Sequence, residues 1–462
     1  MMQRLYRCIS DVYYYGFIAC LFTWSPNGPA QDLIAIYGLA LQNNPQLERA
    51  RESLLAMQES RSQAQATAFL PEAVVNANVN RDYQNIQFGG SAIGLSGSST
   101  FITGGYNLAI TQPLLHIDRW FALDQADSRL AQVEAEQNAV EIDLMLKVAE
   151  RYFDTLAAEE NLKFAHALQQ SLARKLLETK QRQAVGYLAL TDVQEAQAGN
   201  DRAIADALDA DHQLRDAREA LQEATGFYPE ALSVLTDDIP LIEPEPASED
   251  SWVNLALIQN YSVLALQKLV AVAQDDIKRM RAGHLPTLDA TGTHSFATSG
   301  GRFGSADVED TVVGLNFSVP LYQGGRVNSK TREAEHKYRQ ALADLDEKKR
   351  AIHRAASKAY RGVVAGISRV KALQQALQSS ETALKATLAG FNAGRRTNLD
   401  VIIAERERLA AQRDYAKARY DYLLSSLKLK QAVGSLSPDD LQQINRWLIN
   451  QQPERRVSDG AP

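Results

Sequence analysis

The chain has 462 residues, of which 23% are charged, with a formal net charge of −7 at pH 7 and a pI of about 5.7. This acidic balance argues against nucleic-acid binding, because neutralising phosphates requires a basic face. Both cysteines, Cys8 and Cys20, lie near the N-terminus, so the rest of the chain carries neither a disulfide framework nor a thiolate site. No apolar stretch long enough to cross a bilayer as a helix follows them, and we expect no transmembrane helix.

Residues 1–30 have the composition of a secretory signal peptide. Arg4 and Arg7 form a basic start, which precedes an apolar, aromatic stretch and small residues that offer a cleavage site. Two alternatives remain open for this segment. Instead of a cleaved secretory signal, it could be a disordered tail or a lipoprotein signal in which Cys20 carries the lipid.

An internal duplication runs through the rest of the chain. Matching residues recur in the same order about 208 positions later, as Gly186 and Gly394, Asp192 and Asp400, and Gly226 and Gly434. The chain is therefore predicted to consist of two repeats, residues 31–226 and 252–434, joined by a linker at 227–251. A duplicated unit of this length implies an elongated, pseudo-symmetric architecture.

Each repeat is predicted to contain a helix, two strands, a long helix, a tight turn and a shorter helix. In the first repeat, helical periodicity over 32–68 stops before Pro71. Apolar and polar residues then alternate over 73–80 and 106–111, which predicts two strands with one apolar face. The segment 89–105 between them is rich in Gly, Ser and Thr and is predicted to be a loop.

The long helices are the strongest prediction. Residues 118–184 contain neither proline nor glycine and are dominated by good helix formers, and 327–393 is the counterpart. At about 1.5 Å per residue each would reach roughly 100 Å, so the helices must pack lengthwise as a coiled-coil bundle or an α-barrel. Two shorter helices are predicted at 190–225 and 399–433. A short C-terminal helix is predicted within 435–450, and a disordered tail at 451–462.

The strands of the second repeat are predicted at 287–296 and 313–321, around a loop at 300–310. Four strands cannot close a membrane barrel, since known ones begin at about eight. In lipid, an open sheet edge leaves backbone groups unpaired at a cost of several kcal/mol each. The strands therefore either form a soluble sheet capped by a coiled coil or combine across subunits, where two copies supply eight strands and three supply twelve.

Several short motifs follow one another along residues 32–448. They are Asn43-Asn44-Pro45, Phe69-Leu70-Pro71, Thr191-Asp192-Val193-Gln194, Gly283-His284-Leu285-Pro286, Pro320-Leu321-Tyr322-Gln323-Gly324-Gly325 and Leu399-Asp400-Val401. Together with the duplicated plan, they make the chain resemble the TolC family of outer-membrane channel-tunnel proteins. The resemblance implies an all-α plus membrane-β fold, in which a homotrimer forms a twelve-stranded outer-membrane β-barrel that continues into a twelve-helix periplasmic α-barrel.

The resemblance also implies a function and partners. The protein would be the passive outer-membrane exit duct of a tripartite efflux pump or a type I secretion system, with no enzymatic activity and no cofactor. It would contact outer-membrane lipid and join an inner-membrane transporter, of the proton-driven RND or the ATP-driven ABC kind, through a periplasmic adaptor. The residues implied at the adaptor-docking tip are Gly186, Tyr187, Leu188, Gly394 and Arg395.

A gate that closes this tip at rest is implied residue by residue. Arg396 takes the arginine position of the gate, and Thr191 and Asp192 take the positions of its acceptors. An arginine fork can bond both a carboxylate and a hydroxyl, and such charge-assisted hydrogen bonds are the stronger kind. Phe391 takes the position of a gate tyrosine, although its ring lacks the phenolic hydroxyl.

An acidic ring in the pore is implied at Asp400, because a trimer would place three carboxylates at the constriction, where they attract cations. A second acidic position of the family falls at Ile403, which carries no charge. Without the resemblance, the charges at the tip would be interpreted as ordinary solvated turn charges.

Two other classes of protein were weighed against a channel. A structural coiled-coil or adhesin-like envelope protein would explain the helices, but it has no need of a lipid-facing band of strands. A soluble enzyme is disfavoured, because no arrangement of nucleophile, base and orienting group is present. The seven histidines are dispersed without metal-ligand spacing, so no metal site is expected.

Overall fold

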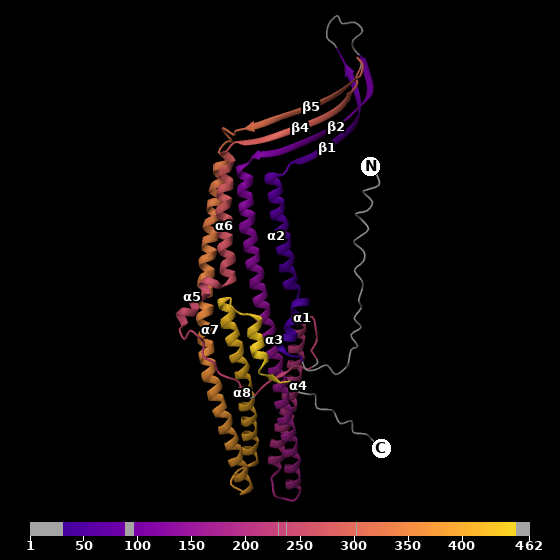
Figure 1. Cartoon of the computed structure of the whole chain (residues 1–462). Coiled ribbons are helices and arrows are strands. Elements are labelled where there is room, and N and C mark those ends of the chain that lie inside the picture. The colour runs from indigo at the N-terminus through magenta and orange to yellow at the C-terminus, as the bar shows by residue number, and fades with distance from the viewer. Residues whose placement is uncertain (1–30, 88–96, 230, 237, 302, 450–462) are drawn as a thin grey trace, which may run out of the picture.

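The computed structural model describes residues 31–87, 97–229, 231–236, 238–301 and 303–449. The predicted signal peptide, Cys20 and the C-terminal tail lie outside these residues. Figure 1 shows an elongated protomer with a curved sheet at one end and two long helical hairpins at the other. Between them lies a middle level, which we call the equatorial belt, where α1, α5, α9 and the short strands β3 and β6 gather against the long helices.

The helices follow the predicted plan, except that the single helix predicted at the start of each repeat is broken in two, at Asn44 and at Asn260. The predicted helix at 32–68 is instead two helices, because Asn44 caps a new helix and Pro45 occupies its first position. The helices are α1 (Leu33–Asn43), α2 (Pro45–Phe69), α3 (Ile117–Ala184), α4 (Leu190–Thr225), α5 (Glu249–Gln259), α6 (Tyr261–Arg281), the 3₁₀ turn η1 (Ala282–His284), α7 (Arg326–Asn392), α8 (Asn398–Val433) and α9 (Pro438–Asn445). Among the described residues no single helix is long and apolar enough to cross a membrane, and α5 and α6 pass that test only as a pair bent by 43°.

Four antiparallel strands form the sheet in the order β1 (Glu72–Ile86), β2 (Gly97–Leu115), β4 (Thr287–Ser299) and β5 (Ala306–Ser318). The loop predictions at 89–105 and 300–310 are therefore partly wrong, because 97–105 and 306–310 lie in strands. Val75, Val79, Val313 and Leu315 are exposed on one face in the period-two pattern of an apolar strand surface. Within the described protomer β1 and β5 are the two edges of this sheet.

A second, two-stranded sheet lies in the equatorial belt. There β3 (Val234–Leu235), from the segment between the repeats, pairs with β6 (Leu448–Ile449), which follows α9. The short C-terminal helix thus ends at Asn445, before the strand, and the segment between the repeats is pinned to the end of the second repeat.

The same capping device stands in the belt in both repeats. Asn44 Oδ1 accepts hydrogen bonds from two backbone amides in the first turn of α2, at 2.9 and 3.3 Å, and its Nδ2 donates to the Ala224 carbonyl at 3.0 Å. Asn260 repeats this with the first turn of α6, at 3.0 and 3.3 Å, and with the Ala432 carbonyl at 2.9 Å. Both asparagines are buried, so each break between consecutive helices is joined to the end of a hairpin helix.

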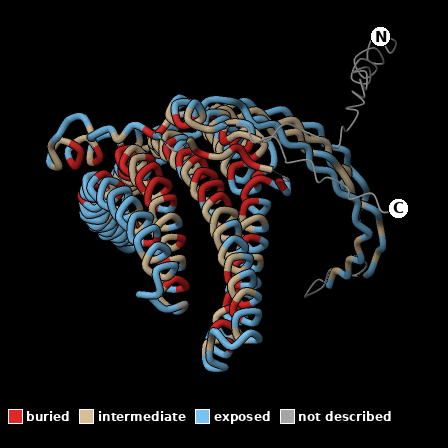
Figure 2. The backbone as a smooth tube through the Cα atoms, turned by 90° about the horizontal axis from the view of Figure 1, so that it is seen from below, coloured by how far each residue is buried: buried red, intermediate tan, exposed pale blue. Residues whose placement is uncertain are grey.

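The main hydrophobic core also centres on the belt. Phe153 of α3 stacks on Tyr420 of α8 with ring centroids 5.6 Å apart, and Tyr152 meets Phe153 edge-on at 5.6 Å. Tyr420 donates a 2.7 Å hydrogen bond to Glu160 Oε1, and burial raises the pKa of its hydroxyl. Figure 2 shows the buried residues gathered along the helices, whereas the sheet is exposed or intermediate almost throughout.

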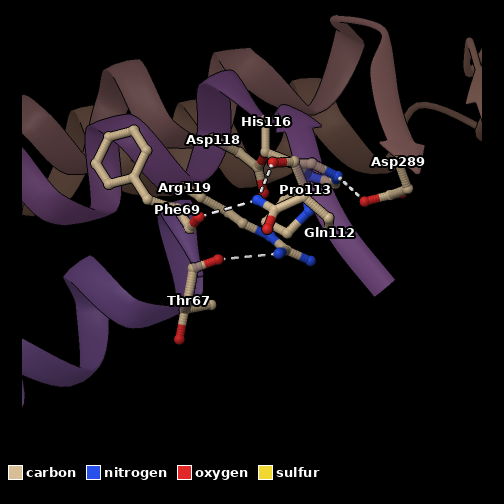
Figure 3. A network of polar contacts seen from close by, with 8 residues as sticks. All are labelled: Thr67, Phe69, Gln112, Pro113, His116, Asp118, Arg119 and Asp289. Carbon is tan, nitrogen blue, oxygen red and sulfur yellow. Dashed lines mark hydrogen bonds and ion pairs between the residues drawn. The ribbon is translucent and has the colours of Figure 1, made fainter. Parts of the chain in front are cut away.

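Polar contacts fix the junction where the strands meet the helices (Figure 3). His116 is buried at the start of α3, with Nε2 2.9 Å from Asp289 Oδ1 of β4 and Nδ1 3.6 Å from Asp118 Oδ1. One turn further, Arg119 donates to the Thr67 carbonyl at the end of α2 at 3.0 Å. The two repeats are thereby connected at the level where the sheet begins.

Candidate gate and docking tips

Each helical hairpin closes in a turn that depends on one glycine. Gly186 and Gly394 have φ of +82° and +71°, a left-handed conformation that residues with a Cβ rarely adopt. In the first turn, Tyr187 N–H donates to the Arg182 carbonyl at 2.9 Å. In the second, Gly394 N–H donates to the Phe391 carbonyl at 3.0 Å. The turns therefore hold the last residues of α3 and α7 through their backbones.

The two turns present different surfaces. Tyr187 is 82% exposed and Leu188 is half-buried beside it, and the neighbouring Val185 and Leu190 are exposed as well. The second turn instead carries Arg395, also exposed. The first tip is thus apolar and aromatic, and the second is basic.

The predicted gate residues all lie near these tips, but the fold does not join them within one protomer. Thr191 is exposed in the first turn of α4, and the carboxylate of Asp192 accepts a 2.9 Å hydrogen bond from Ala189 N–H. Arg396 is exposed, and its Nη1 lies 3.9 Å from Asp400 Oδ1. Among the described residues, no hydrogen bond or ion pair connects Arg396 to Thr191 or Asp192.

Asp400 serves as a capping group at the start of α8. Its Oδ2 accepts hydrogen bonds from the backbone N–H and the hydroxyl of Thr397 at 2.8 and 2.9 Å, and Thr397 Oγ1 accepts one from Asp400 N–H at 3.2 Å. These hydrogen bonds, followed by the nearby positive charge of Arg396, lower the pKa of the Asp400 carboxyl below its ordinary value. Asp400 is therefore ionised at neutral pH, as a charged ring would need.

Phe391 lies against residues that sequence reasoning missed. Its ring centroid is 4.1 Å from Lys175 Nζ and 5.3 Å from Arg182 Cζ, both on α3 of the other hairpin. The missed signal is a pair of basic residues seven positions apart, which places them on one helix face. A second contact between the hairpins, the apolar cluster of Leu172, Ala203 and Ile402, lies close by.

The described residues contain no group of three or more His, Cys, Asp or Glu side chains that could hold a metal ion. The tips instead carry short hydrogen bonds at the first turns of α4 and α8, in partly exposed positions at the ends of the two long hairpins. The contacts that join the two hairpins near the tips include those of Phe391 with α3 and the apolar cluster of Leu172, Ala203 and Ile402.

Comparison with known proteins identifies relatives over nearly the whole chain. A family model described as "Outer membrane efflux protein" matches residues 36–227 and 252–435. The outer membrane protein TolC of Vibrio cholerae is 34% identical over 436 residues, which cover 93% of this chain and 97% of that protein. The proteases secretion protein PrtF of Dickeya chrysanthemi is 27% identical over 427 residues, which cover 91% of each.

The fold also matches a solved structure. The CmeC outer membrane channel of Campylobacter jejuni superposes with a TM-score of 0.75 at 16% sequence identity, over 90% of each chain. At this identity the match shows a shared fold. The combination of long helices with a small sheet is thus found in an outer membrane channel whose structure is known.

Proposed function

Because this chain belongs to the family of outer membrane efflux proteins, we propose that it works as a passive, homotrimeric channel. Its place is the outer membrane and its function is that of an exit duct for efflux and type I secretion, as predicted from the sequence. The family consists of channel proteins, which leaves the coiled-coil adhesin without support.

The open sheet is the observation that supports a barrel shared between copies, and the family resemblance supplies the number three. Its edges, β1 and β5, have no strand partner within the described residues, and four strands are too few to close into a barrel on their own. In the hydrocarbon region unpaired edges would cost several kcal/mol per group, and only a closed barrel avoids this. Three protomers would supply twelve strands for the barrel and extend it into a twelve-helix tunnel, with the face of Val75 and Val313 toward outer-membrane lipid.

We assign the resting closure of the tunnel to the tips. Since Arg396 does not reach Asp192 or Thr191 within a protomer, its fork would bond them across the subunit boundary, with Phe391 beside it. Such half-solvated links should contribute on the order of 1 kcal/mol each, which suits a gate that must also release. Asp400 of the three protomers would form the acidic ring that favours cations.

Docking is assigned to the two turns. The exposed Tyr187 and the half-buried Leu188 at Gly186 offer an apolar contact to a periplasmic adaptor, and the basic Arg395 at Gly394 offers a charged one. The adaptor would connect the channel to an inner-membrane RND or ABC transporter. The division into a signal peptide at 1–30, two repeats, an equatorial segment between them and a C-terminal equatorial helix belongs to the same proposal.

The trimer is tested by heat-modifiable migration. Protein extracted in mild detergent should migrate as a trimer in an unheated gel. After boiling it should migrate as a monomer, smaller than the 51.0 kDa of the full chain by the mass of the cleaved signal peptide. A sample that stays monomeric and soluble without detergent would refute the shared barrel.

The gate is tested by single-channel conductance in planar bilayers. Arg396→Ala and Asp192→Ala should each increase the resting current, because each removes one side of the same link. Unchanged current in both variants would remove these residues from the gate.

A further inference from the structure

We propose that Phe391 closes the tip within each protomer through a cation–π latch formed with Lys175 and Arg182. This inference rests on the proposed gate and gives Phe391 a role that needs no phenolic hydroxyl. Lys175 Nζ is 4.1 Å and Arg182 Cζ 5.3 Å from the ring centroid. Both lie within about 6 Å, where the negative face of an aromatic ring attracts a cation. The latch connects the end of α7 to α3, and hence one hairpin to the other.

A single carboxylate positions both cations. Lys175 and Arg182 are two helical turns apart on one face of α3, with Glu178 between them. Glu178 Oε2 lies 3.1 Å from Lys175 Nζ, and Glu178 Oε1 lies 2.7 Å from Arg182 Nη2. The Lys175 side chain is only 14% exposed, against 46% for Arg182. Lys175 is therefore the stronger partner of the ring, since a desolvated cation is attracted more strongly.

Both halves of the latch are bonded to the turns assigned to docking. Tyr187 N–H donates to the carbonyl of Arg182, and Gly394 N–H donates to the carbonyl of Phe391. A partner that reshapes either turn must therefore move one side of the latch. The latch thus couples docking at the surface to closure, and no separate transmitting element is required.

The apolar cluster beside the latch makes release local. Leu172 and Ile402 keep the two hairpins in contact when the ring and the cations separate, because their contact needs no charge. Opening then consists of a swing of the last turns about this contact, rather than a separation of the hairpins along their length.

The latch is tested by conductance in planar bilayers on the full-length trimer. Phe391→Leu and Lys175→Met should each raise the open-state occupancy on the order of tenfold, and the double variant should add little more, because both remove one interaction. Phe391→Trp should restore closure. Lys180→Met is the matched control, since Lys180 lies on the same helix but bonds Gln197 at 3.3 Å. Full additivity, or closure unaffected by Phe391→Leu, would overturn the latch.

A fluorination series separates electrostatics from shape. Replacing Phe391 by phenylalanine with one, two and three ring fluorines weakens the negative face stepwise at nearly constant size. Open occupancy should rise with each fluorine, and a flat series would reduce Phe391 to a packing residue. If Arg396→Ala opens the channel while the series stays flat, the gate stands and the latch falls. If no tip variant changes the current, both proposals fail.

Discussion

At the equatorial belt, Asn44 and Asn260 make the same three hydrogen bonds in the two repeats, whereas at the tips Ala189 stands where the second repeat has Thr397. The two belt asparagines are buried, and each caps the start of one helix while it bonds a carbonyl at the end of another. The capping residues at the tips are less buried and hold only their own turns. The duplicated chain is therefore symmetric in the buried belt and asymmetric at the tips that we propose for docking, and local stability should fall from belt to tip.

The largest expected effect contrasts two glycines that follow consecutive helices of the second repeat, Gly394 after α7 and Gly434 after α8. Gly434 has φ of +85°, and an added Cβ would lie 2.9 Å from the Gln259 carbonyl oxygen, whereas Gly394 has open space around it. Gly434→Ala should destabilise by about 2–5 kcal/mol through strain and overpacking, and Gly394→Ala by only about 1–2 kcal/mol. Thermal unfolding followed by circular dichroism in detergent measures both. Equal losses would contradict the contrast between belt and tip.

Much of the fold could be predicted from single stretches of sequence. The α3 and α7 helices follow from the lack of proline and from helix-forming composition. The strand at 97–105 was missed because glycine normally indicates a loop. Here Gly105 is required by packing, since a Cβ would lie 2.2 Å from the Phe296 carbonyl oxygen of the neighbouring strand.

The candidate site could be predicted only as a set of positions. Thr191, Asp192 and Arg396 were found through the duplicated turns and the family resemblance. Lys175 and Phe391 are far apart in sequence and meet only when two hairpins pack, so no local pattern predicts their contact. The break between α5 and α6 at Asn260 was also hard to predict from local sequence, because no proline follows this residue. Its capping role is evident mainly from the hydrogen bond that it donates to the buried Ala432 carbonyl.

The second prediction tests the symmetry of the belt. Asn44→Ala and Asn260→Ala should destabilise by about 2–3 kcal/mol each, because each loses a helix cap and leaves a buried carbonyl unsatisfied. Thermal unfolding should show similar shifts for the two variants. Asn43→Ala is the control, since Asn43 only donates an exposed hydrogen bond to Leu39. A large shift of the unfolding temperature in only one of the two variants would show that the two repeats contribute unequally to stability, although their hydrogen bonds are alike.

The third prediction concerns pH and the tips. Because Thr397 and Arg396 lower the pKa of Asp400, its ionised form stabilises the start of α8 above the ordinary pKa of about 3.9. That stabilisation is lost as the pH falls through the lowered pKa. Hydrogen exchange should therefore show the first turn of α8 protected at neutral pH and loosened only below about pH 4.

Two amide variants provide the comparison between repeats. Asp400→Asn should loosen the first turn of α8 at every pH, because an amide accepts the two hydrogen bonds of Thr397 more weakly than a carboxylate. Asp192→Asn should loosen α4 less, since Asp192 bonds a single backbone amide. Equal exchange in the two variants would contradict the stronger cap in the second repeat.

The smallest effect comes from building the missing cap into the first repeat. Ala189 has φ −79° and ψ 161°, close to the −86° and 166° of Thr397, so the hydroxyl in Ala189→Thr can accept from Asp192 N–H. The first turn of α4 should gain about 0.5–1 kcal/mol, seen as slower hydrogen exchange, and Ala189→Val is the control of equal shape. The new hydroxyl would also donate to the Asp192 carboxylate and draw it from Arg396, so the resting current should rise slightly. If hydrogen exchange slows but the resting current is unchanged, Asp192 takes no part in closing the gate. If Ala189→Thr and Ala189→Val slow hydrogen exchange equally, the threonine cap has not formed.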